Sequence, residues 1–465
     1  MTANNENILR DKKRIHFIGV GGSGMYPLVQ ILHKEGYQIS GSDNNETDTL
    51  AAERKMGVTV YLGQRPENLD GAELIVYSAA IMADNPELIA AKASGVPIME
   101  RAELLGIVTA RYSNALCVSG THGKTTTSSM LTQILFEAGL DPSAVIGGKL
   151  PLIGGSGRAG SSELMVCEAC EFVDTFLRLY PDTAIILNID NDHLDYFGTI
   201  ENSMKSFRRF ADKATRLVIA NGDDPNTRKA LAGIDKTVVT FGTHSANDYT
   251  AANIQHSDGR ERYNTSFDLL HKGALVTQII LHVPGIHNIY NAMAAAVAAL
   301  SAGASPLQVA NGLEHFKGAG RRFEILGHVN GVTIADDYAH HPAELAATLA
   351  AAKSMGYHAV WAVFQPFTFS RTAMLLDDFA KALSLADNVV LSPIMGSREV
   401  NTFNIYSSDL AAKLTTCTVL DTFKDISEYV LSHAAEGDLV ITLGCGDIYK
   451  AAKIMAGTSL SVPSN

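Results

Sequence analysis

The sequence has no long hydrophobic run, few cysteines and a polar start. Its most apolar helical stretch, residues 289–304, is alanine-rich, interrupted by Asn291 and too short to span a bilayer. The first fourteen residues are polar and charged and contain no apolar core of the signal-peptide type. Five cysteines in 465 residues do not form a disulfide framework. We therefore expect a cytoplasmic protein without a membrane partner.

Positive charge is scarcer than negative charge. The chain has 37 lysines and arginines against 49 acidic residues, a formal net charge of −12. This balance opposes a general role on nucleic acid or on anionic membranes. A phosphate site can still carry local lysines and arginines, so the net charge does not exclude nucleotide substrates.

Apolar strand-like runs alternate with helical patterns along nearly the whole chain. This alternation predicts an α/β protein with parallel sheets, and the length requires several domains. We expect three domains, at residues 1–113, 114–320 and 321–465. The glycine-rich segment 147–160 is expected to be a mobile surface loop, and the alternating polar stretch 249–283 to be antiparallel.

A first glycine-rich loop follows the apolar run 15–18 and precedes a helical pattern. Its spacing, Gly19-x-Gly21-x-x-Gly24, with Asp43 at the end of the next strand, is the fingerprint of a dinucleotide site. The pattern alone also fits a structural turn, a nicotinamide or flavin site, or a site for another diphosphate nucleotide. The candidate binding residues are Gly19, Gly21, Gly22, Ser23, Gly24 and Asp43.

A second loop, Gly-Thr-His-Gly-Lys-Thr-Thr-Thr at residues 120–127, follows another apolar strand. Two glycines let the backbone curl around phosphate oxygens, and Lys124 offers a charge to the β and γ groups. The Thr125 hydroxyl is placed to reach Mg²⁺. We therefore predict ATP binding by Gly120, Thr121, His122, Gly123, Lys124, Thr125 and Thr126.

Two ionisable residues follow apolar runs in the same segment. Glu168 and His193 are each expected at the C-terminal edge of a sheet, where open α/β sheets place ligands. They could hold a second metal ion beside the phosphates, or be a surface acid and a capping histidine. Cys167 and Cys170 form a C-x-x-C pair without a second pair, so we expect buried apolar cysteines and neither a zinc site nor a disulfide.

The third domain contains two polar segments that each follow a strand. The segment 336–342 includes His340 and His341, and some of its residues could also be helix caps. The segment 365–371 ends in Arg371, which is suited to a carboxylate or a phosphate unless it is simply solvated.

These motifs together resemble the Mur ligases of peptidoglycan synthesis, most closely the branch that adds L-alanine. The matching segments are residues 16–25, 41–43, 120–127, 168–171, 188–195, 287–291, 321–324, 336–342, 370–372 and 444–449. The resemblance implies a UDP-sugar domain, a central ATPase domain and a C-terminal Rossmann-like domain. The first loop would then bind the UDP diphosphate and not a nicotinamide cofactor.

The implied reaction uses ATP and two Mg²⁺ ions to join the lactyl carboxylate of UDP-N-acetylmuramate to L-alanine through an acyl phosphate. Such an enzyme has small-molecule substrates, no nucleic-acid partner, and is a monomer or weak homodimer. Lys124 would act on the γ-phosphoryl group, Arg371 on an acidic substrate, and His340 or His341 as the base. The resemblance also places Asn188, His287, Asn288, Asn291, Arg322 and Asp337 at the nucleotide, and Thr125, Glu168 and His193 at the metals.

The chain departs from the alanine-adding branch at three positions. Cys170 stands where that branch usually has aspartate, and Phe367 and Phe369 where it has histidine and tyrosine. Three other functions stay open: a murein-tripeptide recycling ligase, a nicotinamide dehydrogenase that uses the first loop, and a regulatory ATP-binding switch. The second loop would have no purpose in a dehydrogenase.

Overall fold

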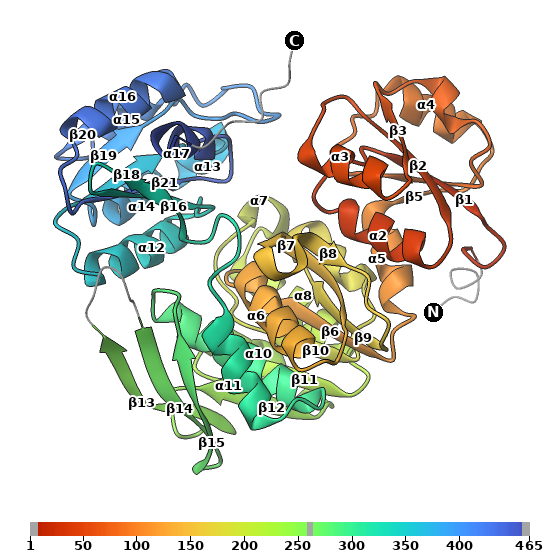
Figure 1. Ribbon diagram of the computed structural model, residues 1–465, viewed down its shortest axis with the longest axis horizontal. Coiled ribbons are helices and arrows are strands. Elements are labelled where there is room, and N and C mark those ends of the chain that lie inside the picture. Colours follow the sequence, from red (N-terminus) through yellow and green to blue (C-terminus); the bar gives the residue numbers. More distant parts are fainter. Residues whose placement is uncertain (1–7, 258–263, 458–465) are drawn as a thin grey trace. The chain divides into compact units, whose positions relative to one another are not determined.

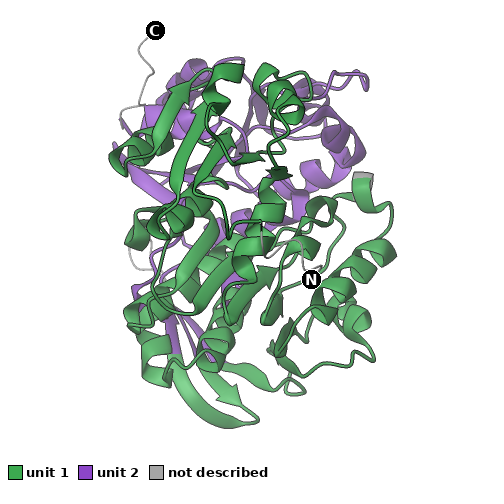
Figure 2. Cartoon of the chain, turned by 90° about the vertical axis from the view of Figure 1, so that its right-hand side faces the viewer, with its two compact units in different colours: residues 1–252, 268–278, 290–313 green, residues 253–267, 279–289, 314–465 purple. Residues whose placement is uncertain are grey.

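Buried strands that alternate with helices form three sheets, which confirms the predicted α/β class (Figure 1). The computed structural model describes residues 8–257 and 264–457. No helix within these ranges has the length and apolar character of a membrane span. The contacts group the chain into two compact units, one of residues 1–252, 268–278 and 290–313 and one of residues 253–267, 279–289 and 314–465 (Figure 2).

The first sheet has five parallel strands in the order β3-β2-β1-β4-β5. The strand order reverses at β1, so the loop after β1 lies at the switch point of the sheet. The apolar runs of the sequence predict strands at 15–20, 38–42, 58–62 and 73–78, which correspond to β1, β2, β3 and β4, and the short β5 is additional. The elements are β1 (Arg14–Ile18), α2 (Tyr26–Lys34), β2 (Gln38–Asp43), α3 (Asp48–Lys55), β3 (Thr59–Leu62), β4 (Leu74–Tyr77), α4 (Pro86–Ala93), β5 (Ile98–Glu100) and α5 (Arg101–Thr109).

The second sheet has ten strands in the order β15-β14-β13-β12-β11-β10-β6-β9-β7-β8. In its parallel centre β10 and β11 are buried throughout, and β6 and β9 are buried except for one residue each, as expected where helices cover a sheet. The elements are β6 (Asn114–Ser119), α6 (Lys124–Glu137), β7 (Ser143–Leu150), β8 (Gly155–Arg158), β9 (Leu164–Glu168), β10 (Thr183–Ile186), α7 (Leu194–Phe197), α8 (Ile200–Asp212), β11 (Leu217–Asn221), α9 (Pro225–Leu231), β12 (Val238–Gly242), β13 (Tyr249–Ser257), β14 (Asn264–His271), β15 (Ala274–Leu281), α10 (His287–Ser301) and α11 (Pro306–His315).

The prediction of a mobile loop at 147–160 is wrong, because this segment belongs to the antiparallel hairpin β7–β8. The glycines allow close approaches. A Cβ on Gly157 would lie 2.5 Å from the Cα of Pro27, and one on Gly147 would lie 2.4 Å from a carboxylate oxygen of Glu168. The hydroxyl of Ser156 also donates to the carbonyl of Ser23, at 3.1 Å. The hairpin therefore contacts both the first glycine loop and the end of β9.

The third sheet has the order β16-β17-β21-β18-β19-β20. All its pairs are parallel except that of the edge strand β16 with β17. The apolar runs of the sequence predict strands at 332–335, 359–364, 388–391 and 439–443, which correspond to β17, β18, β19 and β21, but they do not predict the edge strands β16 and β20. The elements are β16 (Glu324–Val329), β17 (Val332–Asp337), α12 (Pro342–Ser354), β18 (Val360–Phe364), α13 (Phe369–Met374), α14 (Leu376–Leu383), β19 (Asn388–Leu391), α15 (Ser407–Ala411), β20 (Cys417–Val419), α16 (Phe423–His433), β21 (Leu439–Leu443) and α17 (Tyr449–Met455).

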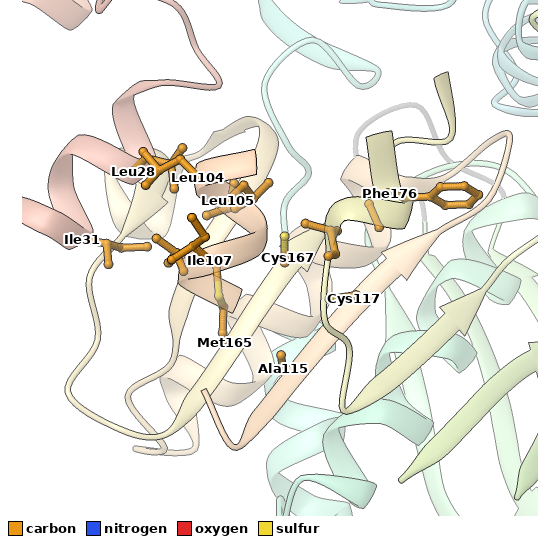
Figure 3. Packing of buried hydrophobic residues seen from close by; sticks show 14 of the residues in the cluster. Leu28, Ile31, Leu104, Leu105, Ile107, Ala115, Cys117, Met165, Cys167 and Phe176 are labelled. Atoms are coloured by element: carbon orange, nitrogen blue, oxygen red, sulfur yellow. The ribbon is translucent and has the colours of Figure 1, made fainter. Parts of the chain in front are cut away.

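One hydrophobic core runs beneath both glycine loops (Figure 3). Side chains from α2 and α5 join those of β6 and β9 in this core, among them Leu28, Ile31, Leu104, Leu105, Ile107, Ala115 and Met165. Cys117 and Cys167 are opposite each other on β6 and β9, fully buried and free. Cys167 is therefore a small core residue, as predicted.

Candidate active site

The first glycine loop, between β1 and α2, is held by the end of β2. The N–H groups of Gly19 and Val20 donate to the carbonyl of Ser42, at 2.8 and 3.0 Å, and that of Gly21 donates to Oδ2 of Asp43, at 3.1 Å. The N–H of Gly22 donates to Gly19. In the described part of the chain, the N–H groups of Ser23 and Gly24 have no internal acceptor. These two are therefore the donors that remain for an anion.

An arginine that the sequence analysis did not select lies against this loop. Arg101 is the first residue of α5, and a Cβ on Gly24 would lie 3.3 Å from its Cζ. Its side chain has no hydrogen bond or ion pair with any residue in the described ranges. A guanidinium offers paired donors to phosphate oxygens, so Arg101 joins Ser23 and Gly24 as a candidate phosphate contact.

A carboxyl group is buried beside the same loop without a hydrogen-bond partner. Glu53 of α3 is fully buried, and neither of its oxygens has a partner within the described residues. Burial and, to a smaller extent, the charge of Asp43 together raise the pKa of Glu53 to about 8. Glu53 is therefore mainly protonated at neutral pH.

This buried acid predicts a pH-dependent stability. The unfolded chain releases the proton of Glu53 above its ordinary pKa of 4.5, whereas the folded chain keeps it up to about pH 8. Stability is therefore lost as the pH rises from about 4.5 to 8, by on the order of 2–4 kcal/mol. In Glu53→Gln, the Tm should fall less between pH 5 and pH 8 than in the wild type. An equal fall in Tm between pH 5 and pH 8 in the two proteins would contradict the assignment.

The second glycine loop connects β6 to α6 and presents Lys124 at the start of that helix. Gly123 has a φ of +87°, and a Cβ there would lie 2.3 Å from Oδ1 of Asn291. The Nζ of Lys124 donates to the carbonyls of Gly120 and Thr121, at 2.6 and 3.1 Å. The loop thus wraps around the lysine, as expected for a phosphate-binding loop.

A buried carboxylate, Glu171, neutralises this lysine. The Nζ of Lys124 lies 3.0 Å from Oε1 and 2.9 Å from Oε2 of Glu171, whose side chain is 3% exposed. Burial lowers the pKa of Lys124, but the charge of Glu171, its hydrogen bond to the lysine and the other negative groups nearby together outweigh that effect, and the pKa is raised. The lysine is therefore fully charged at neutral pH, and Glu171 is a site residue that the sequence analysis missed.

Thr125 and Glu168 form a group of oxygen atoms next to this lysine. The Thr125 hydroxyl donates to Oε1 of Glu168 at 3.1 Å, and the Gly147 N–H donates to Oε2 at 2.9 Å. The Ser128 hydroxyl lies 3.4 Å from Oε2. The structure therefore brings together two of the three predicted metal-binding residues.

His193, the third, lies beside other carboxylates. Its Nε2 is 4.0 Å from Oε1 of Glu171 and 3.7 Å from Oδ2 of Asp192, and its ring packs on Phe172. Over residues 8–257 and 264–457, no group of three or more His, Cys, Asp and Glu side chains is arranged to hold a metal ion.

The end of β10 fixes the conformation of the second loop. Oδ1 of Asn188 accepts the N–H of His122 at 2.8 Å, and its Nδ2 donates back to the carbonyl of that residue at 3.0 Å. The Thr121 hydroxyl accepts the N–H of Asp190 at 2.9 Å. The side chain of Asn188 therefore binds the backbone of the second loop through two hydrogen bonds.

Three of the predicted nucleotide contacts, His287, Asn288 and Asn291, lie at the start of α10. Oδ1 of Asn291 accepts from the Thr127 hydroxyl at 3.2 Å, which joins α10 to α6. Nδ2 of Asn288 donates to the carbonyl of Pro284 at 2.6 Å. His287 begins the helix, and a Cβ on Gly285 would lie 2.3 Å from its ring.

The prediction of a buried cysteine is wrong for Cys170. This thiol is free and exposed, because it lies beyond the end of β9 in the loop that leads to Glu171. The next residue, Glu171, supplies the carboxylate beside Lys124.

The third sheet gathers the remaining candidates at one edge. The strands β17, β21 and β18 are adjacent and parallel, so the loops after them lie at the same edge. His340, His341 and Cys445 lie in these loops, and Arg371 lies in the short helix α13 that follows the loop after β18. Burial raises the pKa of the Cys445 thiol to about 12, and the positive charge of Arg371 opposes this rise. Arg371 lies in α13, after Thr368, whose hydroxyl accepts the N–H of Arg371 at 3.4 Å.

Two aspartates at the end of β17 have different partners. Asp336 accepts from Nε of Arg321 at 2.8 Å and from the Thr442 hydroxyl at 2.6 Å. Asp337 accepts the N–H groups of Phe323 and Ala339, at 2.8 and 2.7 Å. Burial outweighs the opposing charge of Arg322 and these two hydrogen bonds, and the pKa of Asp337 is raised to about 6.

The two adjacent histidines also differ. His341 is the N-cap of α12, where its Nδ1 accepts the N–H of Ala343, and it is buried. The ring of His340 is partly exposed, with Nδ1 3.1 Å from the carbonyl of Tyr338 and 3.2 Å from Oε2 of Glu344. His341 thus holds the helix start, and His340 is the better candidate for a proton acceptor.

Models of Mur ligase domains match most of the chain. A Mur ligase family catalytic domain matches residues 14–113, a Mur ligase middle domain residues 118–299, and a Mur ligase glutamate ligase domain residues 321–446.

Curated proteins and solved structures give the same result. The chain is 44% identical to the UDP-N-acetylmuramate–L-alanine ligase of Lachnospira eligens and 43% identical to that of Acetivibrio thermocellus. The first match covers 94% of this chain and 97% of the relative, and the second covers 95% of each. The crystal structure of a UDP-N-acetylmuramate–alanine ligase from Thermotoga maritima matches with a TM-score of 0.81 at 27% identity, over 96% of this chain and 98% of that one. A murein peptide ligase from Psychrobacter arcticus shares the fold, with a TM-score of 0.73 at 24% identity over 97% and 100% of the two chains.

Two glycine loops that each join a strand to a helix, a lysine held by a buried carboxylate and three matching domain models point to the same family. The chain belongs to the Mur ligase family.

Proposed function

We propose that this protein is an ATP-dependent ligase that joins the lactyl carboxylate of UDP-N-acetylmuramate to L-alanine in cytoplasmic peptidoglycan precursor synthesis. The observation that carries the proposal is the charged Lys124, wrapped by the second glycine loop and neutralised by the buried Glu171. Relatives that share 40–44% identity over nearly the whole chain are named for this reaction. We further propose that the protein acts as a monomer or a weak homodimer.

The reaction must first activate a carboxylate, because hydroxide is a poor leaving group. A lactyl carboxylate oxygen attacks the γ-phosphorus of ATP, the bond to the β,γ-bridging oxygen breaks, and ADP leaves. The amine of L-alanine then attacks the acyl phosphate, loses a proton, and phosphate departs from the tetrahedral intermediate. The products are the amide, ADP and phosphate.

Lys124 serves the first step. Its ammonium, the N–H groups of the loop and the start of α6 stabilise negative charge on the phosphoryl group in flight. The carbonyls of Gly120 and Thr121 hold the ammonium in place, so it needs little reorganisation when the nucleotide binds.

The residues at this loop also fit Mg²⁺. A threonine hydroxyl and a carboxylate, such as those of Thr125 and Glu168 at 3.1 Å, are the oxygen ligands that this ion prefers. We propose that they hold one ion, and that Glu168 and His193 hold a second. When bound there, Mg²⁺ would neutralise negative charge on the phosphate oxygens.

We assign the UDP diphosphate to the first loop, through the N–H groups of Ser23 and Gly24 and the guanidinium of Arg101. In this assignment Asp43 holds the loop through Gly21. For the amine we assign His340 as the proton acceptor and Arg371 as the partner of an acidic substrate group.

A phosphate-release assay tests the function. Wild-type protein with ATP, Mg²⁺ and UDP-N-acetylmuramate should release phosphate rapidly with L-alanine and much more slowly when the amino acid is omitted. Glycine, L-serine and the murein tripeptide serve as competing amines. Faster turnover with the tripeptide would identify a recycling ligase, and phosphate release that does not depend on UDP-sugar would identify an ATPase switch.

A further inference from the structure

A polar network is fully buried beneath the first glycine loop. Nε2 of His16, in β1, lies 2.9 Å from Oε1 of Glu87, in α4, and Nδ1 of His16 lies 2.9 Å from the hydroxyl of Ser40. The Ser42 hydroxyl donates to Oε2 of Glu87 at 2.5 Å. The side chains of His16, Ser42 and Glu87 are all completely excluded from solvent.

The layer around this network is apolar, so packing does not account for it. His16 points to the same face of β1 as Ile18, which packs with Ile75, Leu88 and Ala91 between the sheet and α4. A buried histidine and carboxylate cost desolvation free energy, and a hydrophobic pair of similar volume is often at least as stable. The network therefore calls for a role other than stability.

The network ends on the residue that holds the loop. The hydroxyl of Ser42 donates to Glu87, and the carbonyl oxygen of Ser42 accepts the N–H groups of Gly19 and Val20. Its neighbour Asp43 accepts the N–H of Gly21. A shift of Ser42 would thus move three successive N–H groups, and with them the free donors of Ser23 and Gly24.

A second chain of hydrogen bonds leads from the same helix to the loop after β2. Asn85 is the N-cap of α4, and its Nδ2 donates to Oε1 of Gln64 at 2.6 Å. The same oxygen accepts from Nδ2 of Asn44 at 3.0 Å, and the N–H of Gln64 donates to Oδ1 of Asn44 at 3.2 Å. Both sides of the Ser42–Asp43 corner are therefore tied to the N-terminus of α4.

We propose that His16, Glu87 and Ser42 are positioning residues for the UDP-sugar. They fix the end of β2 and thereby set the position of the N–H donors that the first glycine loop offers to the diphosphate. None of the three touches the substrate. The proposal rests on the assignment of this loop to the UDP-sugar.

Ser42→Ala tests this role with the smallest change, because it removes one hydroxyl and keeps the backbone. A hydrogen bond to a charged group is lost, so we expect the Kd and KM for UDP-N-acetylmuramate to rise about tenfold. The kcat and the KM for ATP should stay within about twofold, since the second loop belongs to a different sheet. Ser427→Ala is the matched control: its hydroxyl is buried and donates to two carbonyls, those of Phe423 and Ala451, but it lies in α16, beside the third sheet.

Two variants at Glu87 separate positioning from packing. Glu87→Gln keeps an acceptor for Ser42 and should bind UDP-sugar nearly as the wild type does, whereas Glu87→Leu should weaken binding like Ser42→Ala. Titration calorimetry gives the Kd, and melting curves show how far each variant is destabilised.

Unchanged UDP-sugar affinity in Ser42→Ala would overturn the positioning role. An equal loss of ATP and UDP-sugar affinity would also overturn it, since this would be general destabilisation. A wild-type protein that binds UDP-N-acetylmuramate but releases no phosphate would contradict the proposed ligase instead, and the binding data would still test the network.

Discussion

Lys124→Ala should reduce kcat about a thousandfold or more, because it removes a preorganised charge from the phosphoryl group in flight. The Tm should also fall, because the buried Glu171 loses its counter-charge. The double variant Lys124→Ala with Glu171→Gln should recover the Tm but not the activity. This recovery would separate the catalytic role of the lysine from its ion pair.

The matched control is Lys205→Ala, an exposed lysine of α8 in the same domain. It should leave both kcat and Tm unchanged. Retention of a tenth of the wild-type activity in Lys124→Ala would refute the assignment of the second loop to ATP.

Glu168→Gln should reduce kcat about a hundredfold or more and should raise the Mg²⁺ concentration needed for half-maximal activity. Glutamine has nearly the same size and can still accept from the Gly147 N–H, so the hairpin should stay in place. The loss would then come from the missing negative charge. Rates measured across a Mg²⁺ titration give both quantities.

Glu163→Gln, at an exposed position just before β9, is the control for this charge change. If Glu168→Gln lost activity but kept the wild-type Mg²⁺ dependence, Glu168 would only orient the hairpin. Wild-type turnover in this variant would exclude Glu168 from the site.

The pattern of hydrophobic residues in the sequence correctly predicted the central strands of the sheets. Strands such as β6 and β10 are continuous buried runs, and each is followed by a polar or glycine-rich turn, so their ends are visible in the sequence. The unpredicted strands β5 and β20 have only three residues each, too few to show a period. The edge strand β16 is mostly half-buried and has no clear alternation.

The hairpin β7–β8 was missed for a different reason. Glycine usually marks a flexible segment, but here it marks close contact. Gly157 meets Pro27 and Gly147 meets Glu168, and both contacts join residues that are far apart in the sequence. Only the folded structure distinguishes these two uses of glycine.

The sequence motifs identified many of the candidate site residues, but they did not show which side chains contact one another. Glu168 and Glu171 both stood in a matching motif, and the spacing did not indicate which carboxylate would hold Lys124. Arg101 lies far from Gly24 along the chain, and His340 and His341 are identical in type. Capping geometry distinguishes the two histidines, and it depends on where α12 begins.

The acyl phosphate is the central claim, and oxygen transfer tests it most directly. UDP-N-acetylmuramate labelled with ¹⁸O in its lactyl carboxylate is incubated with the wild-type protein, ATP, Mg²⁺ and L-alanine. The released phosphate is then analysed by mass spectrometry. If the carboxylate attacks the γ-phosphorus, each phosphate carries one oxygen from the labelled carboxylate and the amide keeps the other. Phosphate without ¹⁸O, released in step with amide formation, would contradict the mechanism.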